Sequence, residues 1–280
     1  MHHSRRLSRA ICTLLASYLV IPSLQASGPG TARRVVLVTG GSRGIGRAIS
    51  KSFAARGDQV VINYRSNRTA AEETLAELAG EGHCVHQCDV SSPEQCLQMV
   101  NGIASRYGRM DVLVNNAATY MDVPLLSTSF EDWTRAWQET LTTNVVGPAS
   151  LSWAAANVMA RQGGGAIVSV SSRGAKRGEP FASPYGASKA ALNSMSQSLA
   201  AALGGQANIA VSAVAPGFVE TDMASAVLEG PVGGAIRAQS PFGRVATPQE
   251  IARVVVFLAE PESCWLSGAV VDCNGASYLH

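Results

Sequence analysis

Residues 35–46 read Val35-Val36-Leu37-Val38-Thr39-Gly40-Gly41-Ser42-Arg43-Gly44-Ile45-Gly46. The apolar run at 35–39 is typical of a buried strand, and the pattern from Gly46 to Arg56 is typical of a helix. The glycines between them predict a tight turn, in which backbone N–H groups and a helix N-terminus can hold a pyrophosphate. We therefore expect cofactor contacts from Gly40, Ser42, Arg43, Gly44, Ile45 and Gly46.

The alternation of strand and helix continues to the end of the chain. Strands are expected at 35–39, 59–64, 84–88, 111–115, 165–171, 209–214 and 269–272, and helices at about 46–56, 69–79, 93–107, 130–161, 183–203 and 248–259. Continuous apolar strands separated by helices predict a Rossmann-type, doubly wound, seven-stranded parallel sheet with helices on both faces. No linker-like stretch divides the series, so residues 34–280 are expected to form a single domain.

Composition excludes several classes of protein. Of the 280 residues, 46% are hydrophobic and 15% charged, which is too apolar for a disordered chain. No apolar stretch after residue 34 is long enough for a membrane bundle. Residues 1–34 hold five of the 22 basic residues and no acid, so the remainder has a net charge of −3. A mildly acidic body without a basic stripe predicts no nucleic-acid partner and no membrane partner.

Residues 1–33 are interpreted as a leader outside the fold. Arg5, Arg6 and Arg9 precede an apolar run from Ala10 to Leu24 and then small residues, as in a signal peptide. An organelle transit sequence and a leader without any address fit the same pattern. The expected location of the folded body is the cytoplasm, with an export or targeting role for the leader left open.

The six cysteines do not have the spacing of a disulfide framework, so free thiols are expected. The segment from His83 to Cys88 alternates histidine and cysteine in a way that suggests metal ligands. On a strand, residues 84, 86 and 88 share one face, which we expect to pack against helices. We therefore predict a buried strand and no metal site.

The end of the second strand indicates which dinucleotide is bound. An acidic residue usually holds a free ribose 2′-hydroxyl at this point, but residues 63–68 read Asn-Tyr-Arg-Ser-Asn-Arg. Arg65 and Ser66 here, and Arg43 in the glycine turn, can instead bind a 2′-phosphate. The sequence therefore favours NADP (NADPH) over NAD.

Tyr185 and Lys189 have the i, i+4 spacing that places two side chains on one face of a helix. An ammonium group there favours the phenolate, so we expect the tyrosine pKa to fall from about 10 towards neutrality. Such a tyrosine can donate a proton to a carbonyl oxygen, or take it back. Ser172 follows the fifth strand, at the edge where open α/β sheets bind ligands.

Taken together, these motifs resemble the short-chain dehydrogenase/reductase family, and the resemblance covers essentially all of residues 34–280. It rests on the glycine turn, Asp89-Val90, Asn115-Asn116-Ala117, Asn144, the set of Ser172, Tyr185 and Lys189, and the segment from Val214 to Met223. Two departures, Ala118 after Asn-Asn-Ala and Asn274-Gly275-Ala276 near the C-terminus, do not touch the proposed chemistry.

The resemblance implies specific roles. Tyr185 would be the acid/base, Lys189 would lower its pKa and bind the nicotinamide ribose, Ser172 would hydrogen-bond the substrate oxygen, and Asn144 would hold a water in a proton relay. The implied cofactor contacts are Asp89 and Val90 to adenine, Asn116, Val219 and Thr221 to the ribose–nicotinamide half, and Pro216 and Gly217 in the segment beside the nicotinamide. The family also implies a homotetramer, with the helix at 183–203 as a contact face.

The substrate is less determined. The segment from Pro216 to Met223 is similar to that of 3-oxoacyl-carrier-protein reductases, but no charged residue lies between Ala190 and Ala215 to dock an acidic carrier protein. Residues 224–243 predict a mobile lid with apolar members. We expect a small apolar carbonyl or alcohol as substrate, with a 3-oxoacyl-carrier-protein reductase as one alternative and a non-catalytic dinucleotide-binding sensor as another.

Overall fold

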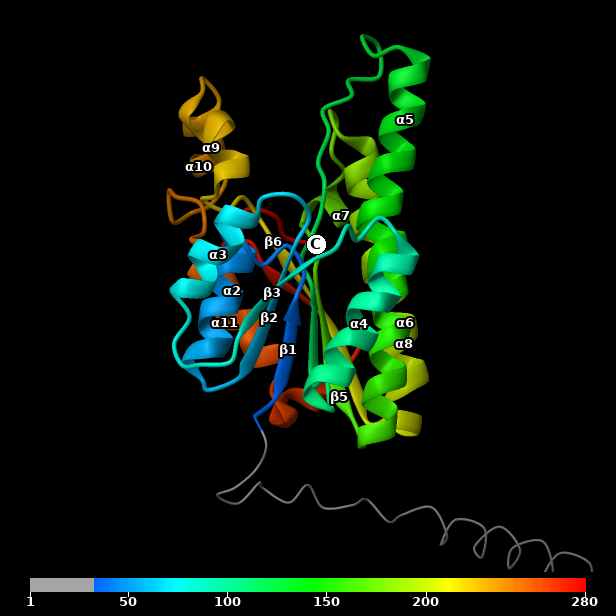
Figure 1. Cartoon of the computed structure of the whole chain (residues 1–280). Helices are drawn as coiled ribbons and strands as arrows, with labels where there is room; N and C mark the ends of the chain where they lie inside the picture. The colour runs from blue at the N-terminus through cyan, green and yellow to red at the C-terminus, as the bar shows by residue number, and fades with distance from the viewer. Residues whose placement is uncertain (1–32) are drawn as a thin grey trace, which may run out of the picture. The chain divides into compact units, whose positions relative to one another are not determined.

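The computed structural model describes residues 33–280 (Figure 1). Seven strands form one parallel sheet in the order β3-β2-β1-β4-β5-β6-β7. They are β1 (Val35–Val38), β2 (Gln59–Tyr64), β3 (Cys84–Gln87), β4 (Val112–Asn115), β5 (Gly165–Val170), β6 (Ile209–Pro216) and β7 (Val270–Cys273). The predicted seven-stranded doubly wound sheet is confirmed. Its strand order reverses between β1 and β4, and such a switch point opens a crevice at the carboxyl ends of the strands.

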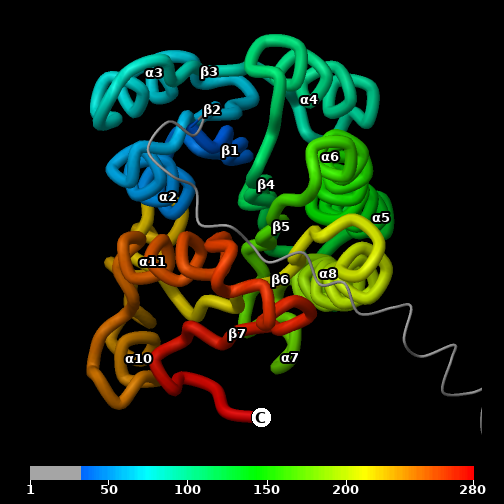
Figure 2. Tube along the Cα trace, turned by 90° about the horizontal axis from the view of Figure 1, so that it is seen from below, coloured from blue at the N-terminus to red at the C-terminus, as the bar shows by residue number. Residues whose placement is uncertain are grey.

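Helices cover both faces of the sheet, as the view along the strands shows (Figure 2). The helices α2 (Gly44–Ala55), α3 (Arg68–Ala76) and α11 (Pro248–Leu258) lie on one face, and α4 (Pro93–Tyr107), α6 (Gly147–Gln162) and α8 (Ser183–Ala207) on the other. The alternation of side chains along β1 explains the two cores: Val36 and Val38 face the first helix layer, and Val35 and Leu37 face the second.

Helix boundaries follow from local chemistry. Ser92 caps α4 by accepting a hydrogen bond from the Gln95 N–H at 3.3 Å, and Gly108 ends this helix in the left-handed conformation. Thr247 and Glu250 form a capping box at the start of α11. These signals are visible in the sequence, which is why the predicted bounds of α4 agree with the structure and those of α11 differ by one residue.

Three short helices lie beyond the carboxyl ends of the strands: α7 (Gly174–Arg177), α9 (Asp222–Glu229) and α10 (Gly233–Ala238) (Figure 1). The last two lie in the segment predicted to be a lid. A 3₁₀ helix, η2 (Pro261–Leu266), precedes β7. Within residues 33–280, none of the helices has the length and apolarity needed to cross a membrane.

Three sequence-based predictions need correction. The strand at 84–88 is not buried: β3 is an edge strand paired only with β2, so Cys84, Val85 and His86 remain partly exposed. The helix predicted at 130–161 is α5 (Phe130–Leu141) joined to α6 through a π turn, η1 (Thr142–Val146). The last helix predicted before the sixth strand continues to Ala207 rather than ending at 203.

The predictions about the cysteines can be compared with the structure, and those about the leader cannot. The five cysteines that lie within the described residues are free thiols, and no group of three His, Cys, Asp or Glu side chains there could hold a metal ion. The predictions about Cys12 and the leader fall on residues 1–32, outside the described part of the chain.

Candidate active site

The glycine turn has the shape needed to hold a pyrophosphate. Gly40 and Gly44 have φ of +58° and +51°, a conformation that other residues adopt only with strain. A Cβ on Gly46 would lie 2.1 Å from the Gly40 carbonyl oxygen, so only glycine fits there. Arg43 stands at the N-cap of α2 without a capping side chain, and no acid lies in the first turn. The N–H groups at the start of α2 are therefore available to an anion.

Two asparagines, from the two strands that flank β1, hold this turn in place. Asn63, at the end of β2, is buried and accepts a hydrogen bond from the Gly40 N–H at 3.2 Å, while its amide donates to the Cys88 carbonyl at 3.0 Å. Asn116, after β4, donates to the Thr39 carbonyl at 2.8 Å and to the Gly40 carbonyl at 3.2 Å. The sequence analysis did not assign a role to Asn63, although a polar residue in an otherwise apolar strand was a usable signal.

The end of β2 is positively charged. Arg65 and Ser66 are exposed directly after the strand, and Arg43 is exposed in the glycine turn. Neither arginine forms an ion pair with any residue of 33–280, whereas the nearby Arg68 is paired with Glu72 at 2.7 Å. Two free guanidinium groups therefore flank the expected position of the adenosine ribose.

The loop after β3 provides the predicted adenine side of the crevice. One carboxylate oxygen of Asp89 accepts hydrogen bonds from the N–H and hydroxyl of Ser91, at 2.9 and 2.7 Å. Val90 is buried, and its carbonyl lies against Gly147, where a Cβ would approach it to 2.4 Å. This packing fixes the loop against α6.

Ser172, Tyr185 and Lys189 come together at the carboxyl edge of β5. The Ser172 hydroxyl accepts a hydrogen bond from the Gly174 N–H at 3.0 Å. The Lys189 ammonium is buried, donates to the Val170 carbonyl at 2.8 Å and lies 5.5 Å from the centroid of the Tyr185 ring. The i, i+4 spacing on α8 thus produces the predicted neighbourhood of phenol and ammonium.

The predicted pKa of the tyrosine is wrong for the protein alone. Burial raises the pKa of Tyr185 to about 12, and a hydrogen bond with Ser172 opposes this rise only in part. Burial also lowers the pKa of Lys189 to about 8. The Lys189 ammonium donates its hydrogen bond to the Val170 carbonyl. Its positive charge does not lower the pKa of Tyr185 enough to offset the rise caused by the loss of water around the phenol. A phenolate therefore needs further positive charge near it.

Asn144 lies in the π turn η1, a feature frequent at functional sites. Its side chain accepts from the Thr119 N–H at 2.8 Å and donates to the Thr119 carbonyl and to the Ser188 hydroxyl, both at 3.0 Å. Ser188 in turn donates to the Tyr185 carbonyl at 2.7 Å. Asn144 thus connects the loop after β4 to the part of α8 that carries the tyrosine.

The segment after β6 closes the other side of the crevice. Pro216, the last residue of β6, accepts a hydrogen bond from the Arg173 N–H at 2.8 Å, and Gly217 follows it. Val219 is buried and pairs with Ala246. The Thr221 methyl carbon lies 3.1 Å from where a Cβ of Gly44 would be, so the chain just before the predicted lid packs against the glycine turn.

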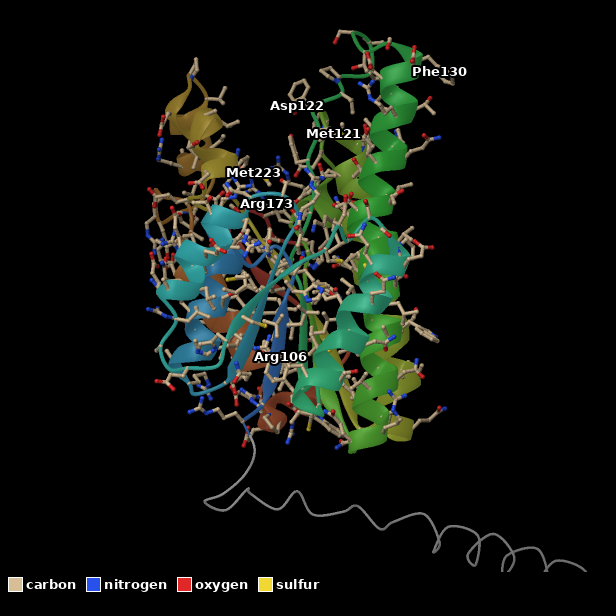
Figure 3. All side chains as sticks on the ribbon, viewed as in Figure 1. Arg106, Met121, Asp122, Phe130, Arg173 and Met223 are labelled. Atoms are coloured by element: carbon tan, nitrogen blue, oxygen red, sulfur yellow. The ribbon has the colours of Figure 1, made fainter. Side chains whose placement is uncertain are left out.

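Two features of the entrance were missed in the sequence. The ring of Tyr120 makes an edge-to-face contact with that of Tyr185, with centroids 5.1 Å apart. The short helix α7 also brings Arg173, Lys176 and Arg177 directly after Ser172. Figure 3 shows Met121, Asp122 and Arg173 at the carboxyl end of the sheet, whereas Arg106 lies at the opposite end. The signal for α7 was present as three basic residues immediately after a candidate catalytic serine.

A pyrophosphate turn and a Ser-Tyr-Lys set on the same edge of a doubly wound sheet define an oxidoreductase that uses a nicotinamide dinucleotide. Comparison with known proteins agrees with this class. A family model described as Enoyl-(Acyl carrier protein) reductase matches residues 40–275. The chain belongs to the short-chain dehydrogenase/reductase family.

Individual relatives cover nearly the whole described chain. An acetoacetyl-CoA reductase of Shinella zoogloeoides is 36% identical over 246 residues, which are 88% of this chain and 99% of the relative. A 3-oxoacyl-[acyl-carrier-protein] reductase of Escherichia coli strain K12 is 35% identical over 246 residues, 88% of this chain and 98% of the relative. The crystal structure of a short chain dehydrogenase from Burkholderia cenocepacia J2315 in complex with NADP has a TM-score of 0.79 and 34% identity, covering 88% of this chain and 97% of that one.

Proposed function

We propose that this protein interconverts a ketone or aldehyde and the corresponding alcohol with NADP(H). The observation that carries the proposal is the arrangement around Tyr185, whose pKa is raised by burial and lowered in part by the Ser172 side chain, and whose ring centroid lies 5.5 Å from the buried Lys189 ammonium. A buried ammonium beside a phenol is costly to maintain and has a clear use in proton transfer.

The residues divide the work as follows. Bound nicotinamide supplies the hydride in reduction and accepts it in oxidation. Tyr185 keeps its proton at neutral pH and donates it to the substrate carbonyl oxygen, while the hydroxyl of Ser172 hydrogen-bonds the same oxygen. Lys189 would hold the nicotinamide ribose of a bound cofactor, and it contributes positive charge when the phenolate forms. Asn144 positions α8 and can hold a water that returns a proton to this site.

NADP is favoured over NAD by the charge at the end of β2. Arg43 and Arg65 are exposed, and neither is ion-paired within the described residues. A guanidinium group binds a phosphate through charge-assisted hydrogen bonds, and no carboxylate follows β2 to bind a free 2′-hydroxyl. The Burkholderia relative was crystallised with NADP, which supports the same choice.

A small apolar carbonyl is the substrate class that the entrance favours. The catalytic tyrosine is flanked by the ring of Tyr120, and the lid helix α9 presents Met223 and Val227, which are 71% and 41% exposed. Exposed apolar side chains on a lid over a polar catalytic centre suit a substrate with an apolar body.

A 3-oxoacyl thioester is the second candidate because two of the relatives carry the names of reductases of such substrates. Docking of an acidic carrier protein would need free basic residues at the entrance. Lys176 is already paired with Asp272 at 3.2 Å, and Arg177 with Glu179 at 3.7 Å, so α7 offers little free charge for this purpose.

The test of function follows NADPH absorbance with three kinds of substrate: apolar ketones, acetoacetyl-CoA and an acetoacetyl carrier protein. We expect turnover of apolar ketones and loss of turnover in Tyr185→Phe, with NADPH binding retained. Tyr120→Phe is a matched control, since it keeps the ring and removes a hydroxyl that bonds only Asp122. Unchanged turnover in Tyr185→Phe would defeat the proposal and favour a sensor that binds dinucleotide without catalysis.

The cofactor preference is tested by Arg65→Asp. A carboxylate at this position should repel the 2′-phosphate and accept the free 2′-hydroxyl of NADH, so the ratio of kcat/KM for NADPH to that for NADH should fall at least about tenfold. Arg68→Asp is the control, because that side chain is engaged by Glu72. An unchanged ratio would remove Arg65 from the phosphate site.

We also propose that copies of the chain assemble, as a tetramer, through the outer faces of α6 and α8. Trp153 on α6 is 64% exposed, and α8 has no charged residue after Lys189. Trp153→Glu should lower the mass measured by light scattering, whereas Phe257→Glu on α11 tests a face that this arrangement does not use.

The expected compartment is the cytoplasm, which fits the free thiols of the described cysteines.

A further inference from the structure

A cavity lies beside the catalytic centre, and its wall does not include the catalytic residues. Its volume is about 620 Å³, and it is formed by the lid helix α10 with the chain that follows it, by the segment after β6 and by the residues after β7. Ser172, Tyr185 and Lys189 are not part of its wall. Arg173, the residue next to Ser172, is.

Arg173 is unusual because its guanidinium group is buried without an acid. The residue is 3% exposed, and no carboxylate of residues 33–280 lies within ion-pair distance of it. One of its terminal nitrogens donates to the Gln239 side-chain oxygen at 2.5 Å, and its central carbon lies 5.2 Å from the centroid of the Phe218 ring. The two contacts hold the group in place but leave its positive charge uncompensated.

The other charged side chains around the cavity are already paired. Arg244 bonds Glu250 at 2.7 Å. Asp272 is bound by Lys176 at 3.2 Å and lies 3.6 Å from the His280 ring nitrogen.

Behind the wall, Glu179 pairs with Arg177 at 3.7 Å rather than with Arg173. Burial lowers the pKa of Arg173, the neighbouring Arg177 lowers it further, and the Glu179 carboxylate, which lies beyond ion-pair distance, opposes this shift only in part. Among the charged side chains of the wall, Arg173 is therefore the one without an ion-pair partner in residues 33–280, and burying such a charge is unfavourable unless an anion joins it.

We propose that this cavity is a binding site for an organic carboxylate with an apolar body, separate from the hydride-transfer site. The planar guanidinium group of Arg173 matches a carboxylate with two parallel hydrogen bonds. Phe218, Ile236 and Phe242 supply apolar wall, and the volume is that of an ordinary small-molecule site.

A ligand in this cavity would act on the lid. Ile236 belongs to α10, and Gln239 is the residue that ends it. A carboxylate bound by Arg173, with its apolar body against Ile236, would connect α10 to the residue next to Ser172. Occupancy would therefore hold the lid closer to the sheet, which links this cavity to substrate exchange.

The experiment is calorimetric titration of the NADPH-saturated protein with 3-phenylpropanoate, with its neutral amide and with inorganic phosphate. We expect the carboxylate to bind at least about tenfold more tightly than either the amide or phosphate, because only the carboxylate offers both the charge and the apolar body. If the amide bound as tightly as 3-phenylpropanoate, the proposed role of the Arg173 charge would be wrong. If phosphate bound as tightly, the proposed role of the apolar wall would be wrong. No measurable binding of 3-phenylpropanoate would overturn the site.

Variants locate the site. Arg173→Gln should weaken binding of 3-phenylpropanoate at least about tenfold, while Arg106→Gln, the same change at the opposite end of the sheet, should leave it unchanged. Gln239→Glu keeps Arg173 and places a carboxylate of the protein beside it. This variant should therefore have a higher Tm and should no longer bind 3-phenylpropanoate. If Arg173→Gln does not fold, Gln239→Glu still tests whether Arg173 binds the probe. Tyr185→Phe should bind the probe normally. Retained binding in Gln239→Glu, or loss of binding in Tyr185→Phe, would place the probe elsewhere and refute the proposal.

Discussion

Replacing Lys189 by methionine should make the protein more stable at neutral pH and inactive. The side chain is buried, and burial lowers its pKa from 10.5 to about 8. A difference of about 2.5 pKa units corresponds to about 3 kcal/mol of unfavourable free energy while the folded lysine is charged. Methionine has a similar length and removes that charge, but it leaves the Val170 carbonyl without its donor, which costs about 1–3 kcal/mol.

The pH dependence separates these two effects. Between the folded pKa of about 8 and the unfolded value of 10.5, the unfolded state binds more protons, so the wild type gains stability as the pH rises. The variant lacks this gain, and the lost hydrogen bond counts equally at every pH. The free energy of unfolding of Lys189→Met relative to the wild type should therefore fall by about 3 kcal/mol between pH 7 and pH 10.5.

Thermal unfolding monitored by circular dichroism measures this effect. For a domain of this size, a change of 3 kcal/mol moves the difference in Tm by roughly 6–12 °C. Gln98→Met, on the exposed face of α4, is the control and should show a difference in Tm that does not depend on pH in this range, because neither side chain ionises. The same Lys189→Met protein should lose at least about 100-fold in kcat. A difference in Tm that is the same at both pH values would refute the idea that a buried, charged lysine is maintained for function at the expense of stability.

Three further predictions concern the same site. Because burial raises the pKa of Tyr185 to about 12, alcohol oxidation, which needs the phenolate, should accelerate steadily from pH 6 to pH 9, whereas ketone reduction should not; parallel profiles in initial-rate assays would contradict this. Asn144→Ala removes three hydrogen bonds of a buried side chain and should cost about 3 kcal/mol in urea unfolding, while Asn157→Ala, on an exposed face, should cost under about 1 kcal/mol. Gly46→Ala would place a methyl group 2.1 Å from a carbonyl oxygen and should weaken NADPH binding at least about tenfold, whereas Gly102→Ala meets open space and should leave binding unchanged; equal affinities by fluorescence titration would show that the turn adapts.

Local patterns explain why most of the fold could be predicted. The strand Gln59–Tyr64 and the helix Pro93–Tyr107 agree with the sequence prediction because a β-branched run and a capped, amphipathic segment need no distant partner to be recognised. The glycine turn was equally accessible, since its positive φ angles and its close approach to backbone restrict the residues that fit. The neighbourhood of Tyr185 and Lys189 follows from helix periodicity alone.

Other features depend on which elements meet. β3 was expected to be buried, but a strand's place at the edge of a sheet is decided by the order of all strands and not by its own residues. The π turn at Asn144 exists where this side chain bonds both the loop after β4 and α8, which come from distant parts of the chain. Asn63 holds the glycine turn only because β1 and β2 are neighbours in the sheet.

The amino-acid sequence by itself determined the strand–helix alternation, the glycine turn and the neighbourhood of Tyr185 and Lys189, because each rests on spacing within one segment. The tertiary structure alone decided the electrostatics: the pKa of Tyr185 rises instead of falling, and Arg173 is left without a counter-ion. Both depend on how much water and which charges remain around a group once distant segments have packed against it, and a linear pattern does not contain that information.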